Sequence, residues 1–340
     1  MTSSTRMSSL FPNNAITRAE RTYQQRSAKP PRTWRRWVNF GVKWLAITLS
    51  LILFGGLLLA SITVRDPLPI AEKLNPLPNI LSIVMGLYHV YLLFQTISRT
   101  ANSISREKEA QTWDMLVLTG IDARQIVRGK WWATIQQQFP QYLLLSVLRI
   151  GTTAGTAISM TGIFYRYSSY YNSTVIMPHP VTIILVALVA FMFTMANLAF
   201  SAACGVMASA ASKRSVVAIA RGFGNQVLLS LVTVIGILYV FTRSFTYSYY
   251  SSFISTIYNA ILGGAVSIID NGFTLTTSNV YVGYFFDYNQ QGSGSPILPL
   301  NLEWLAGAVV ALLLYALLIW FALWRAEKQA VKEMATPVNS

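Results

Sequence analysis

The chain has 340 residues, of which 53% are hydrophobic and only 11% are charged, and its formal net charge is +14. About a quarter of the residues of an average soluble domain are charged, so this composition excludes an ordinary cytosolic enzyme and a disordered chain. One cysteine and two histidines exclude a disulfide framework, a multi-cysteine metal site and a three-histidine zinc centre.

Long uncharged stretches separate the clusters of charge. A helix needs roughly 20 apolar residues to cross the hydrocarbon core, and helices are required because lipid offers the backbone no hydrogen-bond partners. We therefore predict an all-α polytopic membrane protein with six transmembrane helices. The predicted spans are 44–64, 78–98, 132–152, 182–207, 222–242 and 304–324.

The basic residues are divided unequally between the two sides that these spans define. With both termini in the cytoplasm, 21 of the 26 Lys and Arg residues lie inside and five lie outside. The positive-inside rule favours this orientation. We therefore expect a multi-pass protein of the plasma (cytoplasmic) membrane with both termini cytoplasmic.

The tail 1–43 carries nine basic residues and a single acid, Glu20. Because the basic residues come directly before a span, they indicate topology and contact with anionic lipid, at about 1 kcal/mol per basic residue, rather than nucleic-acid binding. The stretch 34–43 alternates Trp, Arg and Lys with apolar residues, which predicts a helix lying at the membrane interface.

Polar side chains in the second span are candidates for function, because such groups are costly in lipid. His89 lies in the middle of the span, and Tyr91 and Gln95 are nearby. We treat these three residues as candidates for lining a translocation path. The alternative for His89 is a bond to a neighbouring helix.

The cytosolic segment 99–131, which we call the elbow, joins the second and third spans and carries ten of the 38 charges. A helix is predicted to end near Ala110. Thr112 is a suitable N-cap for a short helix of about two turns, and Gly120 suits a left-handed C-terminal cap.

On this short helix Trp113, Leu116 and Val117 share one face. A short apolar helix bracketed by charges suits a groove on another protein, and the alternative is an amphipathic helix that lies on the membrane. Asp122, with Gln125 three residues later, predicts a capping box at the start of the helix that leads into the third span.

The elbow also contains a recognisable sequence pattern. The string from Ile104 to Thr119, ISREKEAQTWDMLVLT, followed by QIVRGK at 125–130, resembles the signature of ABC-2-type transporter permeases. In that family an E-x-E-x-x-T segment and a hydrophobic stretch precede an I-V-x-G-K start of the third span. Gln111 stands where the family often has glycine, and Gly120 replaces a proline.

The resemblance implies a type V exporter-like permease architecture, whose six spans and cytosolic termini agree with the charge count. It implies that the elbow seats in a cleft of a separate ABC ATPase, that Glu107 and Glu109 contact the ATPase or its partner helices, and that helix 113–118 is the wedge. Lys130 would fix the start of the third span at headgroup level. The implied ATPase-coupling residues are Arg106, Glu107, Glu109, Thr112, Trp113, Leu116, Gly120 and Lys130.

The third span contains Arg149, a further candidate for lining the pathway. If the span begins near Trp132, Arg149 lies near its outer end and reaches the headgroups; if it begins near Phe139, Arg149 is buried and important. In the fourth span Asn197 and Cys204 lie beside small residues, which is typical of helix packing.

The outer loop 243–302 contains the uncharged apolar stretch 253–269, which ends at Asp270. Seventeen residues with a glycine pair are marginal for a span, so we expect a re-entrant or interfacial helix. The predicted organisation is a basic tail 1–43, a transmembrane domain 44–325 and a cytosolic tail 326–340.

Motifs for catalysis are missing from the chain. It lacks G-x-x-x-x-G-K-[ST], because Lys130 is followed by Trp131, and it lacks G-x-S-x-G and H-E-x-x-H. We expect no enzymatic activity and no cofactor, metal or nucleic acid bound by this chain. ATP and magnesium would bind to the partner ATPase.

Together these features predict the permease subunit of an ATP-binding cassette transporter, an exporter by family analogy. It would form the membrane pathway as a dimer of identical or related chains, coupled to ATPase subunits and surrounded by membrane lipids. The alternative is a polytopic membrane scaffold or sensor that docks a cytosolic partner without transport.

Overall fold

The computed structural model describes residues 17, 19, 20, 22, 33–63, 76–113, 115, 121–171, 180–245 and 302–335. Six long helices account for almost all of these residues, and the described ranges contain no strand, which confirms the predicted all-α class for them. The helices are α3 (Thr33–Thr63), α5 (Pro76–Glu109), α7 (Ala123–Tyr171), α8 (Pro180–Ala210), α9 (Ser215–Phe245) and α12 (Leu302–Ala335).

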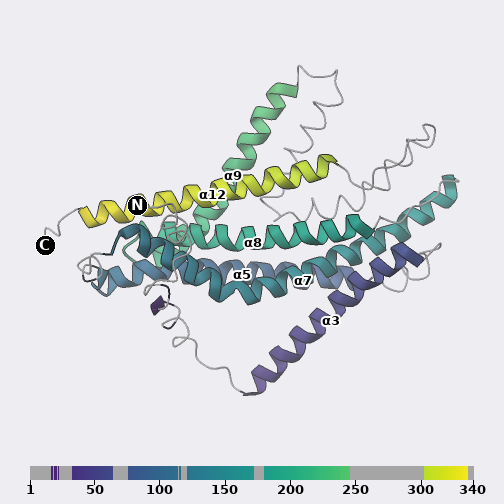
Figure 1. The fold of residues 1–340 in the computed structure, drawn as a ribbon, viewed down its shortest axis with the longest axis horizontal. Coiled ribbons are helices and arrows are strands. Elements are labelled where there is room, and N and C mark those ends of the chain that lie inside the picture. The colour runs from purple at the N-terminus through teal and green to yellow at the C-terminus, as the bar shows by residue number, and fades with distance from the viewer. Residues whose placement is uncertain are drawn as a thin grey trace, which may run out of the picture.

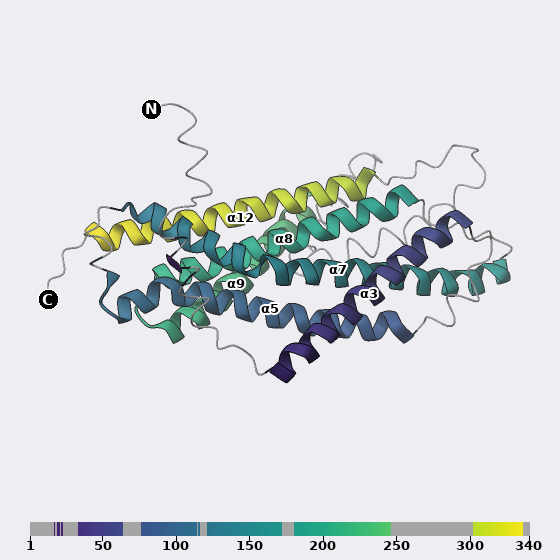
Figure 2. The ribbon, with the colours of Figure 1, turned by 60° about the horizontal axis from the view of Figure 1, so that its bottom comes forward.

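Helices α5, α7, α8 and α12 run side by side along the long axis, whereas α3 and α9 lean away from this bundle (Figures 1 and 2). Helix α8 is central, since it packs against α5, α7, α9 and α12. It is apolar or small on nearly all sides, which is typical of a helix surrounded by others. Helix α3 packs mainly along α7.

Four helices contain segments that are long and apolar enough to cross a membrane, which identifies a membrane protein. These segments are Ile80–Glu109, Pro180–Ala210, Ser215–Val232 and Leu305–Glu333. In α3 the apolar segment within the described side chains is the shorter Lys43–Leu59. Helix α7, which carries the polar run 136–138 and Arg149, is not among the four.

Large apolar side chains are exposed along the outer faces of these helices. Leu87 of α5 is 69% exposed, Ile235 of α9 is 60% exposed and Leu317 of α12 is 60% exposed. Soluble monomers rarely expose extended apolar surfaces. Contact with lipid or with another membrane chain therefore explains these faces.

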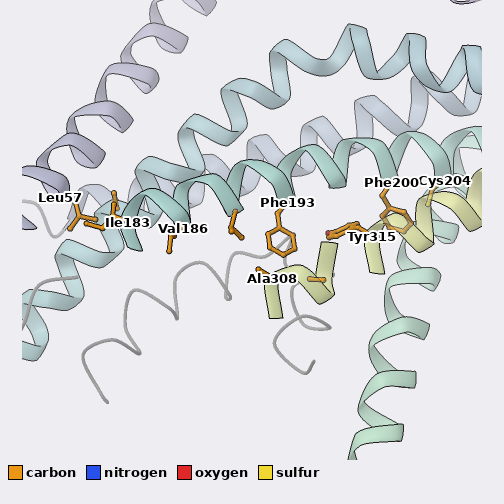
Figure 3. Close-up of a cluster of buried hydrophobic side chains, with 11 residues drawn as sticks. Leu57, Ile183, Val186, Phe193, Phe200, Cys204, Ala308 and Tyr315 are labelled. Atoms are coloured by element: carbon orange, nitrogen blue, oxygen red, sulfur yellow. The ribbon is translucent and has the colours of Figure 1, made fainter. Parts of the chain in front are cut away.

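Aromatic and small residues fill the contact between α8 and α12. The ring of Tyr315 meets Phe193 and Phe200 edge-on, with centroids at 6.1 Å and 5.9 Å. Phe193 and Phe200 are two turns apart on α8, so they flank the tyrosine along the helix (Figure 3). Cys204, at 0% exposure, belongs to the same cluster, which agrees with its predicted packing role.

The close approach of α5, α8 and α9 depends on glycine. A Cβ on Gly205 would overlap Thr100 of α5 and approach the Ile97 carbonyl oxygen to 3.0 Å. A Cβ on Gly222 of α9 would lie 2.7 Å from Ile97. Small residues that bring helix backbones together are typical of membrane bundles.

Candidate functional site

Several helices meet at one end of the bundle, where most of their charged residues lie. Helix α5 has 34 residues and is therefore about 51 Å long, against about 30 Å of hydrocarbon. The last turns of α5, α8 and α12 lie beside the first turns of α7 and α9, as their mutual hydrogen bonds show. We call residues 103–113, 121–131, 207–221 and 323–333 the charged end.

Lys130 of α7 is the centre of a buried ionic junction in the charged end. Its side chain is 2% exposed, and its Nζ lies 2.5 Å from Oε1 of Glu107 and 3.5 Å from Oε2 of Glu20. The same Nζ donates a hydrogen bond to the Ser103 carbonyl at 2.7 Å. Arg106 lies 3.7 Å from Glu20, so two cations face two carboxylates. We call Glu20, Arg106, Glu107 and Lys130 the ionic junction.

The ionic junction links three parts of the chain: the N-terminal segment, the end of α5 and the start of α7. A buried ion pair gains little net stability because desolvation opposes the attraction, but the loss of one partner is strongly destabilising. The Lys130 ammonium group is buried against protein partners, and its expected position at headgroup level stays a prediction. Glu107 likewise has its partner within the chain.

A second set of ionic contacts attaches α12 to the charged end. Lys108 donates to the Ala210 carbonyl of α8, pairs with Glu333 of α12 at 2.5 Å and lies 5.8 Å from the Trp113 ring centroid. Arg128 pairs with Glu327 at 2.6 Å. These contacts hold the C-terminal part of α12 against α5, α7 and α8.

Glu109, at the end of α5, caps the N-terminus of α9. Its Oε1 accepts a hydrogen bond from the Ser215 backbone N–H at 2.8 Å, and its Oε2 accepts one from the Ser215 hydroxyl at 2.6 Å. These bonds, with the nearby Arg214 guanidinium, hold the pKa of Glu109 below its ordinary value. The first turn of α9 has no acid of its own, so Glu109 supplies the negative charge that a helix N-terminus favours.

Helix α5 ends at Glu109, within one residue of the predicted end. The Thr112 N–H bonds the Glu107 carbonyl, and the Gln111 N–H bonds the Lys108 carbonyl. These are the paired bonds of a Schellman motif, in which the residue at the position of Gln111 adopts the left-handed conformation. Gln111 does so, with φ of 56°. The glycine that the resemblance expects at this position therefore has a conformational reason.

The start of α7 follows the sequence prediction closely. Helix α7 begins at Ala123, and Asp122 accepts a hydrogen bond from the Arg124 N–H at 3.1 Å through its side chain. Its carbonyl accepts hydrogen bonds from Gln125 and Ile126. Asp122 is therefore the N-cap of α7, as predicted.

The predicted wedge helix lies only partly within the described residues. Trp113 is 6% exposed and packs against Ile104, Ile126 and Val206, so it anchors the elbow to its own bundle. The expected role of Trp113 in a groove of another protein stays a prediction, and its ring is covered by this chain itself. Met115, by contrast, is 69% exposed. Two coupling candidates, Leu116 and Gly120, lie outside the described residues, as does the predicted re-entrant stretch 253–269.

Some important residues of the charged end were not recognised in the sequence. Glu20 is 5% exposed in the ionic junction. The sequence feature that could have identified it is that it is the lone acid of a basic tail. The hydroxyl oxygen of Ser209 accepts hydrogen bonds from the backbone N–H groups of Ile104 and Ser105, both at 2.9 Å. No sequence pattern marks Ser209, because this contact depends on how α5 and α8 cross.

The polar candidates of the spans separate into two groups. Arg149 is 2% exposed, its Nη1 lies 3.4 Å from the Thr194 hydroxyl, and it interacts electrostatically with His89. The burial expected in the second alternative for Arg149 is therefore observed, while its importance stays a prediction. His89 lies within reach of Asn197 of α8, but its Nε2 has no hydrogen-bond partner among the residues that the structure describes.

The other two pathway candidates are not brought together with Arg149. Tyr91 is 55% exposed and stacks on Tyr88, with ring centroids 6.3 Å apart. Gln95 is half-buried, and its Oε1 has no hydrogen-bond partner within the described part of the chain. Neither side chain is placed beside the His89–Arg149 pair by any contact in the described ranges.

Comparison with known proteins gives no relative: no family model, no curated protein and no solved structure matches the chain. In the described ranges, no three His, Cys, Asp or Glu side chains come together in a way that could hold a metal ion. The contacts described at the charged end are ion pairs and helix caps that join the helices.

Proposed function

We propose that the chain is the permease subunit of an ATP-binding cassette exporter, which forms the membrane pathway as a dimer and is driven by a separate ATPase. The observation that supports this most is the ionic junction. Lys130 ties the end of α5 to the start of α7 through Glu107 in a desolvated contact. Force applied to the elbow would therefore act on both helices at once.

In this proposal α3 and α7 provide the two further spans. The helices alternate in direction, because α5, α8 and α12 end at the charged end and α7 and α9 begin there. The charged end lies in the cytoplasm under the positive-inside rule. Arg149 is compatible with a spanning α7, because its charge is buried against α8 rather than exposed to lipid.

The surface that meets the ATPase is the outward side of the elbow. Glu107 and Trp113 are used inside the chain, whereas Gln111, Thr112 and Asp122 are exposed. Among the described residues of the elbow, Met115 adds a large apolar side chain that is 69% exposed. An apolar anchor surrounded by polar residues is the usual composition of a protein interface.

The exposed apolar faces of the peripheral helices support assembly with a second permease chain. Helix α9 leans away from the bundle (Figure 1) and exposes Val227 and Leu231 on one face, one turn apart. Leu51 and Ile52 of α3 are exposed to a similar degree. A second chain packed on these helices would complete a cavity between two six-helix halves.

The test uses a cysteine at the tip of the elbow. Cys204 is fully buried, so Met115→Cys provides the reactive thiol. A thiol-to-amine crosslinker added to native membranes should attach this variant to a P-loop ATPase, identified by mass spectrometry. The matched control is Val309→Cys, 51% exposed on α12 near the opposite end of the helix, which should give no such adduct.

Two outcomes would contradict the proposal. Labelling of Met115→Cys in intact cells by a membrane-impermeant maleimide would place the elbow outside the cell, where no ATP-driven subunit can reach it. Adducts of Met115→Cys that contain a cytosolic protein without a nucleotide-binding motif would instead support the scaffold or sensor alternative. In that case we expect no ATP-driven transport by this chain.

A further inference from the structure

A groove of about 440 Å³ lies between α7, α8 and α12, at the border between the charged end and the apolar part of the bundle. Its size is within the range of small-molecule and cofactor sites. Three tryptophans, Trp131, Trp320 and Trp324, line it together with the Arg128–Glu327 ion pair. None of these five residues belongs to the ionic junction or to the proposed ATPase-contacting surface.

One wall of the groove is a single face of α12. Ala316, Trp320 and Leu323 follow the spacing of three and four residues that places side chains on one side of a helix. Trp320 and Trp324 stack with centroids 6.3 Å apart and an interplanar angle of 15°. They are 63% and 42% exposed, so a broad flat apolar surface faces outward.

The opposite wall is held rigidly by α7 and α8. The indole N–H of Trp131 donates a hydrogen bond to the Ala199 carbonyl at 3.0 Å, which fixes the orientation of the ring. The polar group of the tryptophan is thereby used within the protein. Its apolar surface is left to the groove.

The head of the groove carries a net positive charge. Arg128 pairs with Glu327 through its Nε, and its Nη groups have no hydrogen bond within the described residues. Lys328 does not line the groove; it is exposed beside it and lies over the ring of Trp324, 5.2 Å from the centroid. Two cations against one carboxylate favour an anionic ligand.

The tryptophans of the groove indicate that it lies at the depth of lipid headgroups. Trp131 begins, and Trp324 ends, a long stretch of sequence without charge. Tryptophans are enriched where a membrane protein passes from hydrocarbon to water. The apolar part of the groove thus faces the acyl chains, and its charged head faces the phosphates of one leaflet.

We propose that this groove is a specific binding site for an anionic phospholipid of the leaflet at the charged end. The acyl chains lie on Trp320 and Leu323, and the phosphate is bound by Lys328 and the Nη groups of Arg128. The site requires only that the chain is a membrane protein. The lipid-site proposal can therefore be correct or wrong independently of the proposed transport function and of the ATPase.

The first experiment tests the charge. The full-length protein is purified in detergent and titrated with phosphatidylglycerol or with phosphatidylcholine of the same acyl chains, and bound lipid is counted by native mass spectrometry. We expect one phosphatidylglycerol to bind more tightly than phosphatidylcholine. Lys328→Gln should weaken it by about fivefold, from the typical attraction of one basic residue to anionic lipid. The control Lys213→Gln, an exposed lysine at the α8–α9 turn, should not.

The second experiment tests the groove itself. Ala316→Trp places a large ring in the groove at an exposed position, so that the fold is retained while the space is filled. It should reduce phosphatidylglycerol binding by at least about tenfold, whereas Ala306→Trp, at another exposed alanine of α12, should leave it unchanged. Equal binding of the two lipids, or unchanged binding by Ala316→Trp, would overturn the proposal.

Discussion

The charged end and the apolar part of the bundle hold the same helices together by different means. At the charged end α5, α7 and α12 are joined by ion pairs such as Lys130–Glu107 and Arg128–Glu327. In the apolar part next to the charged end, α5 and α8 meet through Gly205, which closely approaches Thr100, without any ion pair among the described residues. The first kind of contact depends on charge and the second on volume.

This difference follows from the solvent around each region. Unpaired charge is costly inside a bilayer, so close packing of small residues is the means left to the apolar part. At the charged end water and protein together can stabilise ions, and directional contacts fix the elbow. A change of charge should therefore disturb one region and a change of volume the other.

The largest effect is expected in the ionic junction. Lys130→Met leaves the buried carboxylates of Glu107 and Glu20 without their shared cation, which should cost about 3–5 kcal/mol of stability. The measurement is thermal unfolding in detergent. Lys213→Met, at an exposed lysine, is the control. Equal melting of Lys130→Met and the wild type would mean that the junction does not hold the elbow.

The next effect tests volume in the apolar contact between α5 and α8. Gly205→Ala forces a methyl group onto Thr100 and the Ile97 carbonyl, and overpacking of this kind should cost about 1–3 kcal/mol. Gly86→Ala is the matched control, since no atom lies within 4 Å of its added Cβ. It should be neutral or slightly stabilising. Thr100→Ala should partly rescue Gly205→Ala but not Lys130→Met.

The two regions also differ in how far the sequence predicted them. Uncharged stretches located the six long helices of the described ranges, because the need to satisfy backbone hydrogen bonds in lipid leaves only helices. At the elbow, Asp122 was recognised as an N-cap because capping depends on neighbours in sequence. Local rules therefore predicted the elements and their ends.

Contacts between distant residues were not predictable in the same way. Glu107 and Glu109 were expected to contact the ATPase or its partner helices, and the sequence did not show that one pairs with Lys130 and the other caps α9. Arg149 allowed two readings until its position relative to Thr194 of α8 was known. Which charged residues pair depends on how the helices cross and on their register. The periodic patterns of a single sequence do not show this.

A smaller effect, and a stabilising one, is expected at the end of α5. Gln111 adopts φ of 56°, a conformation that costs a residue with a side chain about 1 kcal/mol relative to glycine. Gln111→Gly should therefore raise the thermal stability. Gln125→Gly, at an exposed position in the first turn of α7, should lower it. A loss of stability in Gln111→Gly would show that the side chain makes a contact worth more than the strain.

The smallest effect is a pH dependence at the cap of α9. Ser215 and Arg214 hold the pKa of Glu109 below the ordinary 4.5, so ionised Glu109 contributes stability above that value, and the contribution is lost as the pH falls through the lowered pKa. The difference in melting temperature between the wild type and Glu109→Gln should be full at neutral pH and shrink in acid. Ser215→Ala should reduce it at neutral pH. A difference that stays constant into acid would show that Glu109 acts through hydrogen bonding alone, so that even the exposed edge of the charged end would not be governed by charge.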